Sequence, residues 1–158
     1  MINNISGILG GYAVTSAMKT FTASQGDRQP TDLAMLRGAR LVTASDTEEG
    51  RAWAESRIKQ LTGGDPITAR FMRRDFFTYV TYFKLSVAGN NQPVLNNVED
   101  AARRRFNIVS LDHRPLNPDK EMEEKLKNEG LAKLRWMIEG CGRWLETGLT
   151  RPTSERPP

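Results

Sequence analysis

Apolar residues at two different spacings divide the first third of the chain into helical and extended segments. A short N-terminal helix is predicted by apolar residues at helical spacing ahead of a glycine pair, namely Ile2, Ile5, Ile8 and Leu9 before Gly10-Gly11. The stretch 21–32 is polar and contains Gly and Pro, which predicts a loop. A second helix is expected to start at Leu33–Arg37, and the apolar, β-branched run Arg40–Ala44 predicts a strand.

The same alternation continues to the C-terminus. We expect a helix from about Glu48 to Leu61 that closes at Gly63-Gly64, since glycine readily ends helices. The aromatic and β-branched sequence FFTYVTYFKLSVAG predicts strand structure, and FNIVSL predicts a later strand. Residues 119–147 form a long helical pattern with these candidate inward positions: Met122, Leu126, Leu131, Leu134, Met137, Ile138 and Trp144. Strands that alternate with helices favour a parallel α/β sheet.

The composition of the chain indicates which broad classes of protein it can belong to. The chain of 158 residues has 27% charged and 38% hydrophobic residues, which suits one soluble globular domain. Its apolar runs fall far short of the roughly 20 residues of a membrane helix, and its start has no features of a secretory signal. One cysteine, Cys141, excludes an internal disulfide framework and fits a reducing cytoplasm. One histidine, His113, argues against a His-based metal site. We therefore expect a cytoplasmic protein without a membrane partner.

Positive charge is concentrated in the middle of the chain. Residues 51–84 contain seven cations and three anions, an excess that equals the net charge of +4 for the whole chain. Aromatic residues are interleaved with the cations: Phe71, Phe76, Phe77 and Tyr79. Cations that neutralise phosphates and aromatic rings that stack on bases would suit single-stranded nucleic acid. The alternative is that the aromatic rings are core and the cations form a solvated face.

A cluster of carboxylates follows the predicted strand in RLVTASDTEEG, residues 40–50. Two interpretations are open from these residues alone. The carboxylates of Asp46, Glu48 and Glu49 can hold a metal ion beside a phosphate and orient a water molecule. Alternatively, Ser45 or Asp46 caps a helix whose dipole favours the two glutamates.

Four segments in order make the chain resemble a known family. They are RGARLVTASDTEEGR, IKQLTGGDPITAR, FKLSVAGNNQP and ARRRFNIVSL, and LRWMIEGCGRWLETGL follows them. Together they resemble the helicase half of phage and plasmid primase–helicases, which are superfamily III helicases with an AAA+ type of ATPase core. The resemblance runs from about Ile5 to Leu149. It implies a three-layer, mostly parallel α/β core of the P-loop NTPase type over residues 1–111, a helical segment over 112–150 and a Pro-rich tail over 151–158.

The resemblance also implies roles at a nucleotide site that binds ATP and Mg²⁺. RLVTASDTEEG is similar to the Walker B strand of the family, in which Asp46 is the metal-associated acid. Glu48 or Glu49 would polarise the attacking water. FKLSVAGNNQP resembles the sensor motif, whose asparagine is Asn90, with Asn91 as the second choice. The residues of GNNQP taken alone favour a turn, because Gly, Asn and Pro are turn residues.

Two further groups of cations take roles from the same resemblance. Lys59 in IKQLTGGDPITAR matches a basic position that leads toward DNA, and Arg70, Arg73 and Arg74 would lie on or near a loop that faces the strand. ARRRFNIVSL would supply an arginine finger to a neighbouring subunit from Arg104 or Arg105. This segment departs from the family pattern, because Arg103 stands where an aromatic residue is usual and Ser110 where a proline is usual.

In the family, a central core strand and a phosphate-binding loop precede the segment that INNISGILGGYAV resembles. The resemblance therefore implies a core that lacks its first strand and its P-loop, and no G-x-x-x-x-G-K-[ST] occurs in this chain. We therefore expect the C-terminal part of a primase–helicase that drives DNA unwinding in replication with ATP, but that hydrolyses ATP poorly when alone. The family acts as a hexameric ring on single-stranded DNA without sequence preference. The alternatives are a non-enzymatic DNA-binding remnant and an oligomerisation module made by the helical C-terminus.

Overall fold

The computed structural model describes residues 2–23, 30–46, 52–90, 106–109, 111 and 115–148. The chain divides into two units, Met1–Asn107 and Ile108–Pro158, which are described separately below. The first unit contains all the strands of the described residues, and the second contains two helices.

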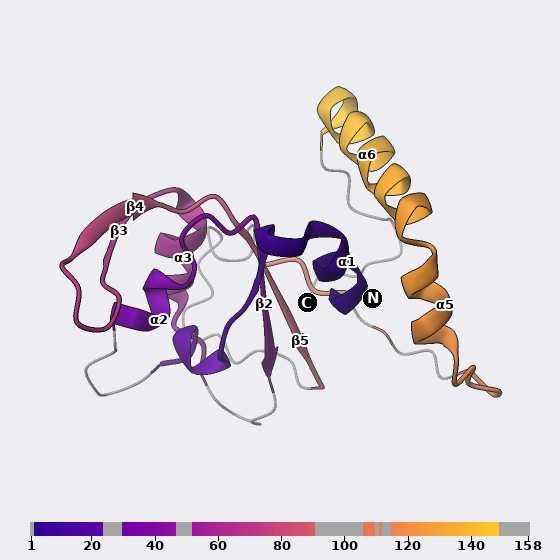
Figure 1. Ribbon diagram of the computed structural model, residues 1–158, viewed down its shortest axis with the longest axis horizontal. Coiled ribbons are helices and arrows are strands. Elements are labelled where there is room, and N and C mark those ends of the chain that lie inside the picture. Colours follow the sequence, from indigo (N-terminus) through magenta and orange to yellow (C-terminus); the bar gives the residue numbers. More distant parts are fainter. Residues whose placement is uncertain are drawn as a thin grey trace. The chain divides into compact units, whose positions relative to one another are not determined.

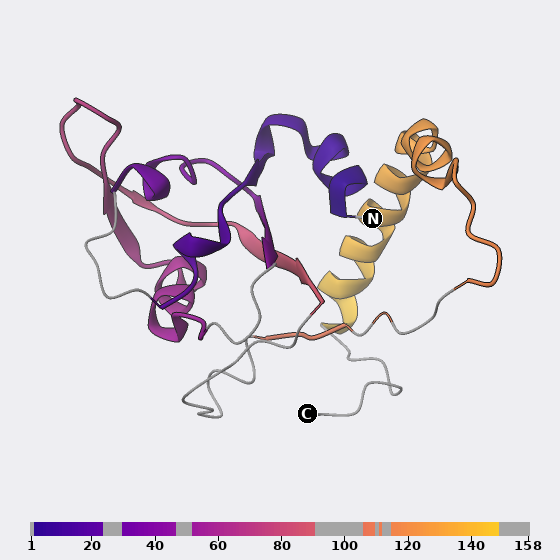
Figure 2. The ribbon, with the colours of Figure 1, turned by 90° about the horizontal axis from the view of Figure 1, so that it is seen from below.

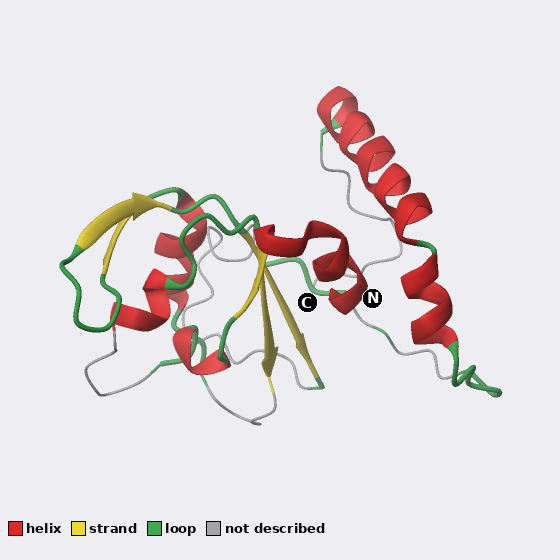
Figure 3. Ribbon diagram, viewed as in Figure 1, coloured by secondary structure: helices red, strands yellow, loops and turns green. Residues whose placement is uncertain are grey.

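A three-stranded parallel sheet organises the first unit. Its strands are β1 (Ala13–Thr15), β2 (Leu41–Asp46) and β5 (Lys84–Gly89), in the order β1-β2-β5. The central strand β2 pairs along its whole length with β5, from Leu41 opposite Lys84 to Asp46 opposite Gly89. Figures 1 and 3 show β2 and β5 side by side. The predicted α/β class with a parallel sheet is confirmed.

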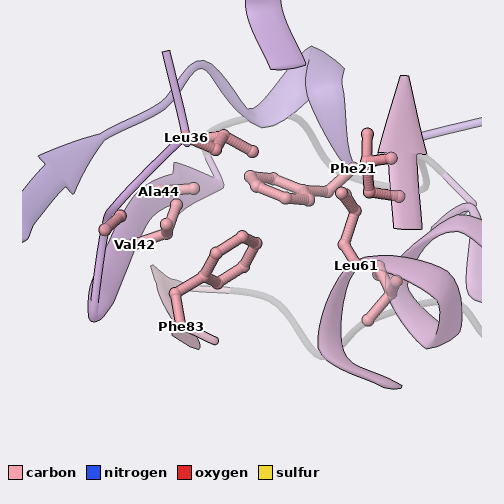
Figure 4. Close-up of a cluster of buried hydrophobic side chains, with 9 residues drawn as sticks. Phe21, Leu36, Val42, Ala44, Leu61 and Phe83 are labelled. Carbon is pink, nitrogen blue, oxygen red and sulfur yellow. The ribbon is translucent and has the colours of Figure 1, made fainter. Parts of the chain in front are cut away.

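One face of this sheet carries the hydrophobic core. Val42 and Ala44 alternate with Thr43 along β2, so the two apolar side chains share a face. They pack with the other core residues: Phe21, Leu36, Ala39, Ile58, Leu61, Ile67 and Phe83. Figure 4 shows the Phe21 and Phe83 rings between Val42 of β2 and Leu61 of the helix α3 (Glu55–Gly63). Each such side chain contributes roughly 1.5–3 kcal/mol when it is fully buried.

Helices lie on both sides of the sheet. The α1 helix (Ile2–Leu9) ends at the glycine pair as predicted and continues as a 3-10 turn, η1 (Gly10–Tyr12). A second 3-10 turn, η2 (Met18–Thr20), follows β1. Figures 1 and 2 show α1 on one side of β2 and β5, and α2 (Pro30–Ala34) and α3 on the other.

The predicted bounds of the two central helices are wrong. The α2 helix starts at Pro30, because the fixed φ of proline suits a first helical position, and it ends at Ala34. The α3 helix starts at Glu55 and not near Glu48, since Trp53 forms an antiparallel bridge with Thr22. The predicted glycine end of α3 is confirmed, with Gly64 in the left-handed region at φ 83°.

The predicted loop 21–32 contains the centre of the core. Phe21 is fully buried, and its carbonyl accepts a hydrogen bond from the Ala54 amide at 2.8 Å. This pairing with the segment before α3 involves residues far apart in the chain, so the local polar composition could not predict it. The short strand β1 was missed for a similar reason, because its three residues gain their partner only in β2.

A separate antiparallel hairpin interrupts the connection between α3 and β5. Its strands are β3 (Pro66–Ala69) and β4 (Phe77–Val80), with Ala69 opposite Phe77 at the loop end. The sequence analysis predicted strand structure at β4 and β5 but did not predict β3. Figures 1 and 2 show the hairpin loop projecting from the first unit, away from the carboxyl ends of β2 and β5.

The second unit contains α5 (Met122–Asn128) and α6 (Gly130–Thr147). The predicted single helix over 119–147 is therefore divided at Glu129. None of the predicted inward positions is buried, and Leu131, Ile138 and Trp144 are among the exposed large apolar residues. The predicted strand FNIVSL is not found, because its described residues 106–109 and 111 are in no strand. Within the described part of the chain, no helix is long and apolar enough to cross a membrane.

Candidate functional site

The carboxyl ends of β2 and β5 bring two predicted site residues together. Asp46 is the last residue of β2 and pairs with Gly89, the last residue of β5. Asn90 follows Gly89 directly and is exposed. Because the strands are parallel, the chain leaves both at the same edge of the sheet. The predicted partners Glu48, Glu49, Asn91, Arg104 and Arg105 lie outside the described residues.

The residue types at this edge fit Mg²⁺. Mg²⁺ is bound in most protein sites through one or two carboxylates and retains several water ligands, and Asp46 is the carboxylate residue at this edge. Among the described side chains, no group of three or more His, Cys, Asp or Glu residues is placed to hold a metal ion.

Hydroxyl side chains form a row across the middle of the sheet, three residues before Asp46 and Gly89. Thr15 Oγ1 lies 3.2 Å from Thr43 Oγ1, and Thr43 pairs in register with Ser86. Register partners on neighbouring strands share a face, so this row lies on the face opposite Val42 and Ala44. The sequence analysis missed these residues, because only the pairing of three separate strands aligns them.

The two edges of the parallel sheet differ. β1 offers an edge of only three residues. β5 offers six residues, and no strand of the described chain pairs with its outer edge. A long unpaired edge presents a row of backbone donors and acceptors to any strand that can pair with it.

Three predicted cations lie together on the hairpin. Arg70, Arg73 and Arg74 belong to the seven residues that join β3 to β4, Arg70–Phe76, which we call the basic loop. All three are exposed, and Asp75 is the one acidic residue of the loop. The Arg74 amide donates to the Phe71 carbonyl at 3.1 Å, which closes a turn. Within that turn Arg73 has φ 59°, a left-handed conformation that is uncommon for a residue with a side chain.

Aromatic rings flank the arginines of the basic loop. The Arg70 guanidinium lies over the Phe76 ring at 4.9 Å from its centroid, and Phe76 is 59% exposed. The Phe71 and Phe77 rings stack at 5.5 Å. Phe77 and Tyr79 are half-buried. The sequence left open whether these rings are available to nucleic acid or belong to the core. The rings of the basic loop are exposed, and the rings of β4 are half-buried.

Two contacts attach the hairpin to residues 33–37, which form the end of α2 and the turn after it. The Tyr79 hydroxyl donates a hydrogen bond to the Leu33 carbonyl, and the Arg37 guanidinium lies over the Phe77 ring at 5.1 Å. Burial raises the pKa of Tyr79 from its ordinary value of 10.0 to about 12, so this hydroxyl keeps its proton at neutral pH. Arg37 was missed by the sequence analysis, because it lies outside the basic sector.

Lys59 is on α3 and does not belong to the basic loop. It is exposed on α3, where its neighbour Ile58 faces the core. The structure thus gathers Arg70, Arg73 and Arg74 on one loop and places Lys59 on the helix that leads into the hairpin.

These features define an α/β protein with a parallel sheet, two polar residues at its carboxyl edge and a basic hairpin between its second and third parallel strands. Residues 4–105 match a protein family described as a family of unknown function (DUF5906), and the chain belongs to that family. The match begins within α1 and covers the remaining elements through β5, including the hairpin, and it excludes α5 and α6. No curated protein shows a significant sequence match to the chain.

Proposed function

We propose that this chain is the C-terminal part of a primase–helicase of the phage and plasmid type, a superfamily III helicase with an AAA+ ATPase core. The observation that carries the proposal is the pairing of Asp46 with Gly89, which sets Asn90 beside the end of β2. An acidic strand end and an amide on the adjacent parallel strand are the arrangement that the sequence resemblance implies.

The proposed chemistry is ATP hydrolysis at the carboxyl edge of the sheet. Asp46 would hold Mg²⁺, which spreads the charge that develops on the transferred phosphoryl group. Asn90 can donate to a phosphate oxygen through its NH₂ group and accept from water through its carbonyl. Glu48 or Glu49 would orient the attacking water. Arg104 or Arg105 would reach the site of a neighbouring subunit and stabilise the transition state there.

The outer edge of β5 supports this assignment. A phosphate-binding loop must stand beside Asp46 and Asn90 for hydrolysis, and a strand paired in parallel with β5 would end at the same edge of the sheet. We propose that β5 receives such a strand, because its six-residue edge has no partner strand within the described residues. The chain without that strand and loop would bind ATP weakly and turn it over slowly.

The basic loop would bind the nucleic acid. Arg70, Arg73 and Arg74 are exposed cations that can neutralise phosphates without reading bases. Phe76 and Met72, which are 59% and 73% exposed, are available to contact unstacked bases. This combination fits single-stranded DNA bound without sequence preference. Lys59 on α3 would add a further phosphate contact.

Fluorescence anisotropy with labelled single-stranded DNA at two salt concentrations tests this function. We expect salt-sensitive binding that is lost in the variant Arg70→Ala, Arg73→Gly, Arg74→Ala. Glycine is used at position 73 because it accepts the positive φ and removes only the side chain. An absence of binding at low salt contradicts the nucleic-acid part of the proposal. ATP turnover by the chain alone at the rate of an intact helicase contradicts the incomplete nucleotide site.

A second candidate function, as an oligomerisation module, is favoured by one observation on α6. Apolar residues recur along this helix at alternating intervals of three and four: Leu131, Leu134, Ile138, Cys141 and Leu145. This spacing is typical of helices that pack against other helices, and all five residues are exposed. The helix would then contribute to the homo-oligomer, a hexameric ring in the family that the sequence resembles.

A further inference from the structure

The hairpin that carries the basic loop is held by one face, on which Ile67 and Ala69 of β3 are buried beside their register partners Tyr79 and Phe77 of β4. A two-stranded hairpin is marginally stable by itself in water and needs packing against another element. Along β4, Thr78 and Val80 are exposed, whereas Phe77 and Tyr79 are half-buried. Since alternate residues share a face, the face of Phe77 and Tyr79 is the one that attaches the hairpin to the rest of the unit.

Besides the packing of Ile67 in the core, two contacts of that face end on one short segment, residues 33–37. Tyr79 donates its hydroxyl hydrogen to the carbonyl of Leu33, near the end of α2. The same carbonyl accepts from the Leu36 amide at 3.1 Å, so the Tyr79 hydroxyl is its second donor. Four residues later, Arg37 covers the Phe77 ring. Phe77 also contacts Tyr79 and stacks on Phe71 of the basic loop.

The same segment continues directly into the central strand of the sheet. Arg40 donates its amide to the Tyr12 carbonyl at 2.8 Å and accepts at its own carbonyl from the Lys84 amide at 2.9 Å. Arg40, which lies between this segment and β2, is therefore hydrogen-bonded at the starts of both β1 and β5. A contact with residues 33–37 consequently fixes the hairpin relative to the sheet and not merely to a loose connection.

We propose that Tyr79 and Arg37 are positioning residues that set the orientation of the basic loop for binding single-stranded nucleic acid. This inference rests on the proposed function of the loop. Arg37 and Tyr79 both contact Phe77, whose ring stacks on Phe71 of the basic loop, and the arginines of the basic loop make the phosphate contacts.

Binding measurements with Tyr79→Phe test the role, because this change removes the hydroxyl and retains the ring. We expect the Kd for single-stranded DNA to rise by about 3- to 10-fold, the range that corresponds to the loss of one ordinary hydrogen bond. The matched control is Tyr82→Phe, which removes the hydroxyl of a 67% exposed tyrosine just beyond the same strand and should leave Kd unchanged. Equal effects of the two variants contradict the inference.

A second comparison separates positioning from a general loss of stability. In the background Arg70→Ala, Arg73→Gly, Arg74→Ala, a positioning residue has no arginines left to orient, so Tyr79→Phe should no longer change the residual Kd. The conservative change Arg37→Lys retains the charge but not the planar group over Phe77, and it should weaken binding without reducing its salt dependence. A Tyr79→Phe effect of the same size in both backgrounds contradicts the inference.

A distance measurement tests the positioning role of Tyr79 even if the chain binds no nucleic acid. In a Cys141→Ser background, spin labels at Met72→Cys in the basic loop and Ser56→Cys on α3 report the distance between loop and helix. Both positions are exposed. Tyr79→Phe should broaden or shift the distance distribution, and Tyr82→Phe should not. An unchanged distribution overturns the positioning role, whereas a shifted distribution with no DNA binding overturns only the proposed function.

Discussion

Asp46 and Gly89 are register partners at the ends of β2 and β5, and Asn90 follows Gly89 directly. The acidic end of β2 and the amide that follows β5 therefore lie at one edge of the sheet. Forty-four positions separate Asp46 from Asn90 in the chain, as their residue numbers show. Parallel pairing of β2 with β5 brings the two residues to the same edge of the sheet.

Asp46→Asn tests the proposed metal ligand. The change keeps the size of the side chain and removes the charge that would bind Mg²⁺. We expect it to lower kcat by about 10²–10³ in a chimera that places a phosphate-binding strand and loop ahead of this chain, the usual scale for the loss of one electrostatic contact to a transition state. Steady-state ATP turnover is the measurement. Asp65→Asn, at an exposed residue after α3, is the control and should retain full turnover.

Arg73→Gly tests phosphate binding by the basic loop. Each phosphate contact to a single strand contributes about 0.7 to the slope of log K against log salt. We expect the variant to reduce the slope by about that amount, as measured by anisotropy titrations over a range of salt concentrations. Lys120→Ala, which removes one exposed cation from the second unit, should leave the slope unchanged. Equal slopes for Arg73→Gly and the unmodified chain would show that Arg73 contacts no phosphate.

The raised pKa of Tyr79 predicts that the free energy of unfolding decreases at alkaline pH. Its pKa is raised to about 12 in the folded protein, against 10.0 for an unperturbed tyrosine. The unfolded chain therefore loses this proton first as the pH rises, and the stabilisation present below pH 10 declines between about pH 10 and 12. Urea unfolding across this range should show a smaller decline in the free energy of unfolding for Tyr79→Phe. The same decline in both proteins would contradict the burial of this hydroxyl.

Phe21→Ala tests the observed core. Phe21 is fully buried between β2 and α3, so its truncation leaves a cavity as well as losing apolar contact. We expect a loss of about 3–5 kcal/mol in the free energy of unfolding, measured with urea. Met72→Ala, at a 73% exposed position on the basic loop, should change stability by less than about 0.5 kcal/mol. A small effect of Phe21→Ala would contradict the packing described above.

Ile138→Asp tests whether α6 associates with other copies of the chain. A carboxylate in the centre of the apolar row would be buried without a partner in any helix–helix contact. If the unmodified chain forms an assembly, we expect the Ile138→Asp variant to dissociate into smaller species, as measured by sedimentation velocity. Glu139→Ala, on the polar side of the same helix, should leave the assembly intact. A monomeric unmodified chain at all accessible concentrations would exclude α6 as an oligomerisation surface.

The sequence by itself determined the elements whose pattern is local. β2 and β5 follow from their β-branched and apolar residues, and α1 and the end of α3 follow from helical spacing and glycine. The sequence also singled out Asp46, Asn90 and the three arginines of the basic loop, because acidic, amide and basic residues keep their chemistry wherever they lie.

Only the tertiary structure decided which of these residues meet. Phe21 in a polar stretch became core through its pairing with the segment before α3, and β3 formed because β4 was available to pair with it. The apolar positions of α6 have the spacing of a buried face and yet are exposed in their unit. Hydrogen bonds and packing between residues distant in the chain depend on three-dimensional neighbours, and local periodicity contains no information about those neighbours.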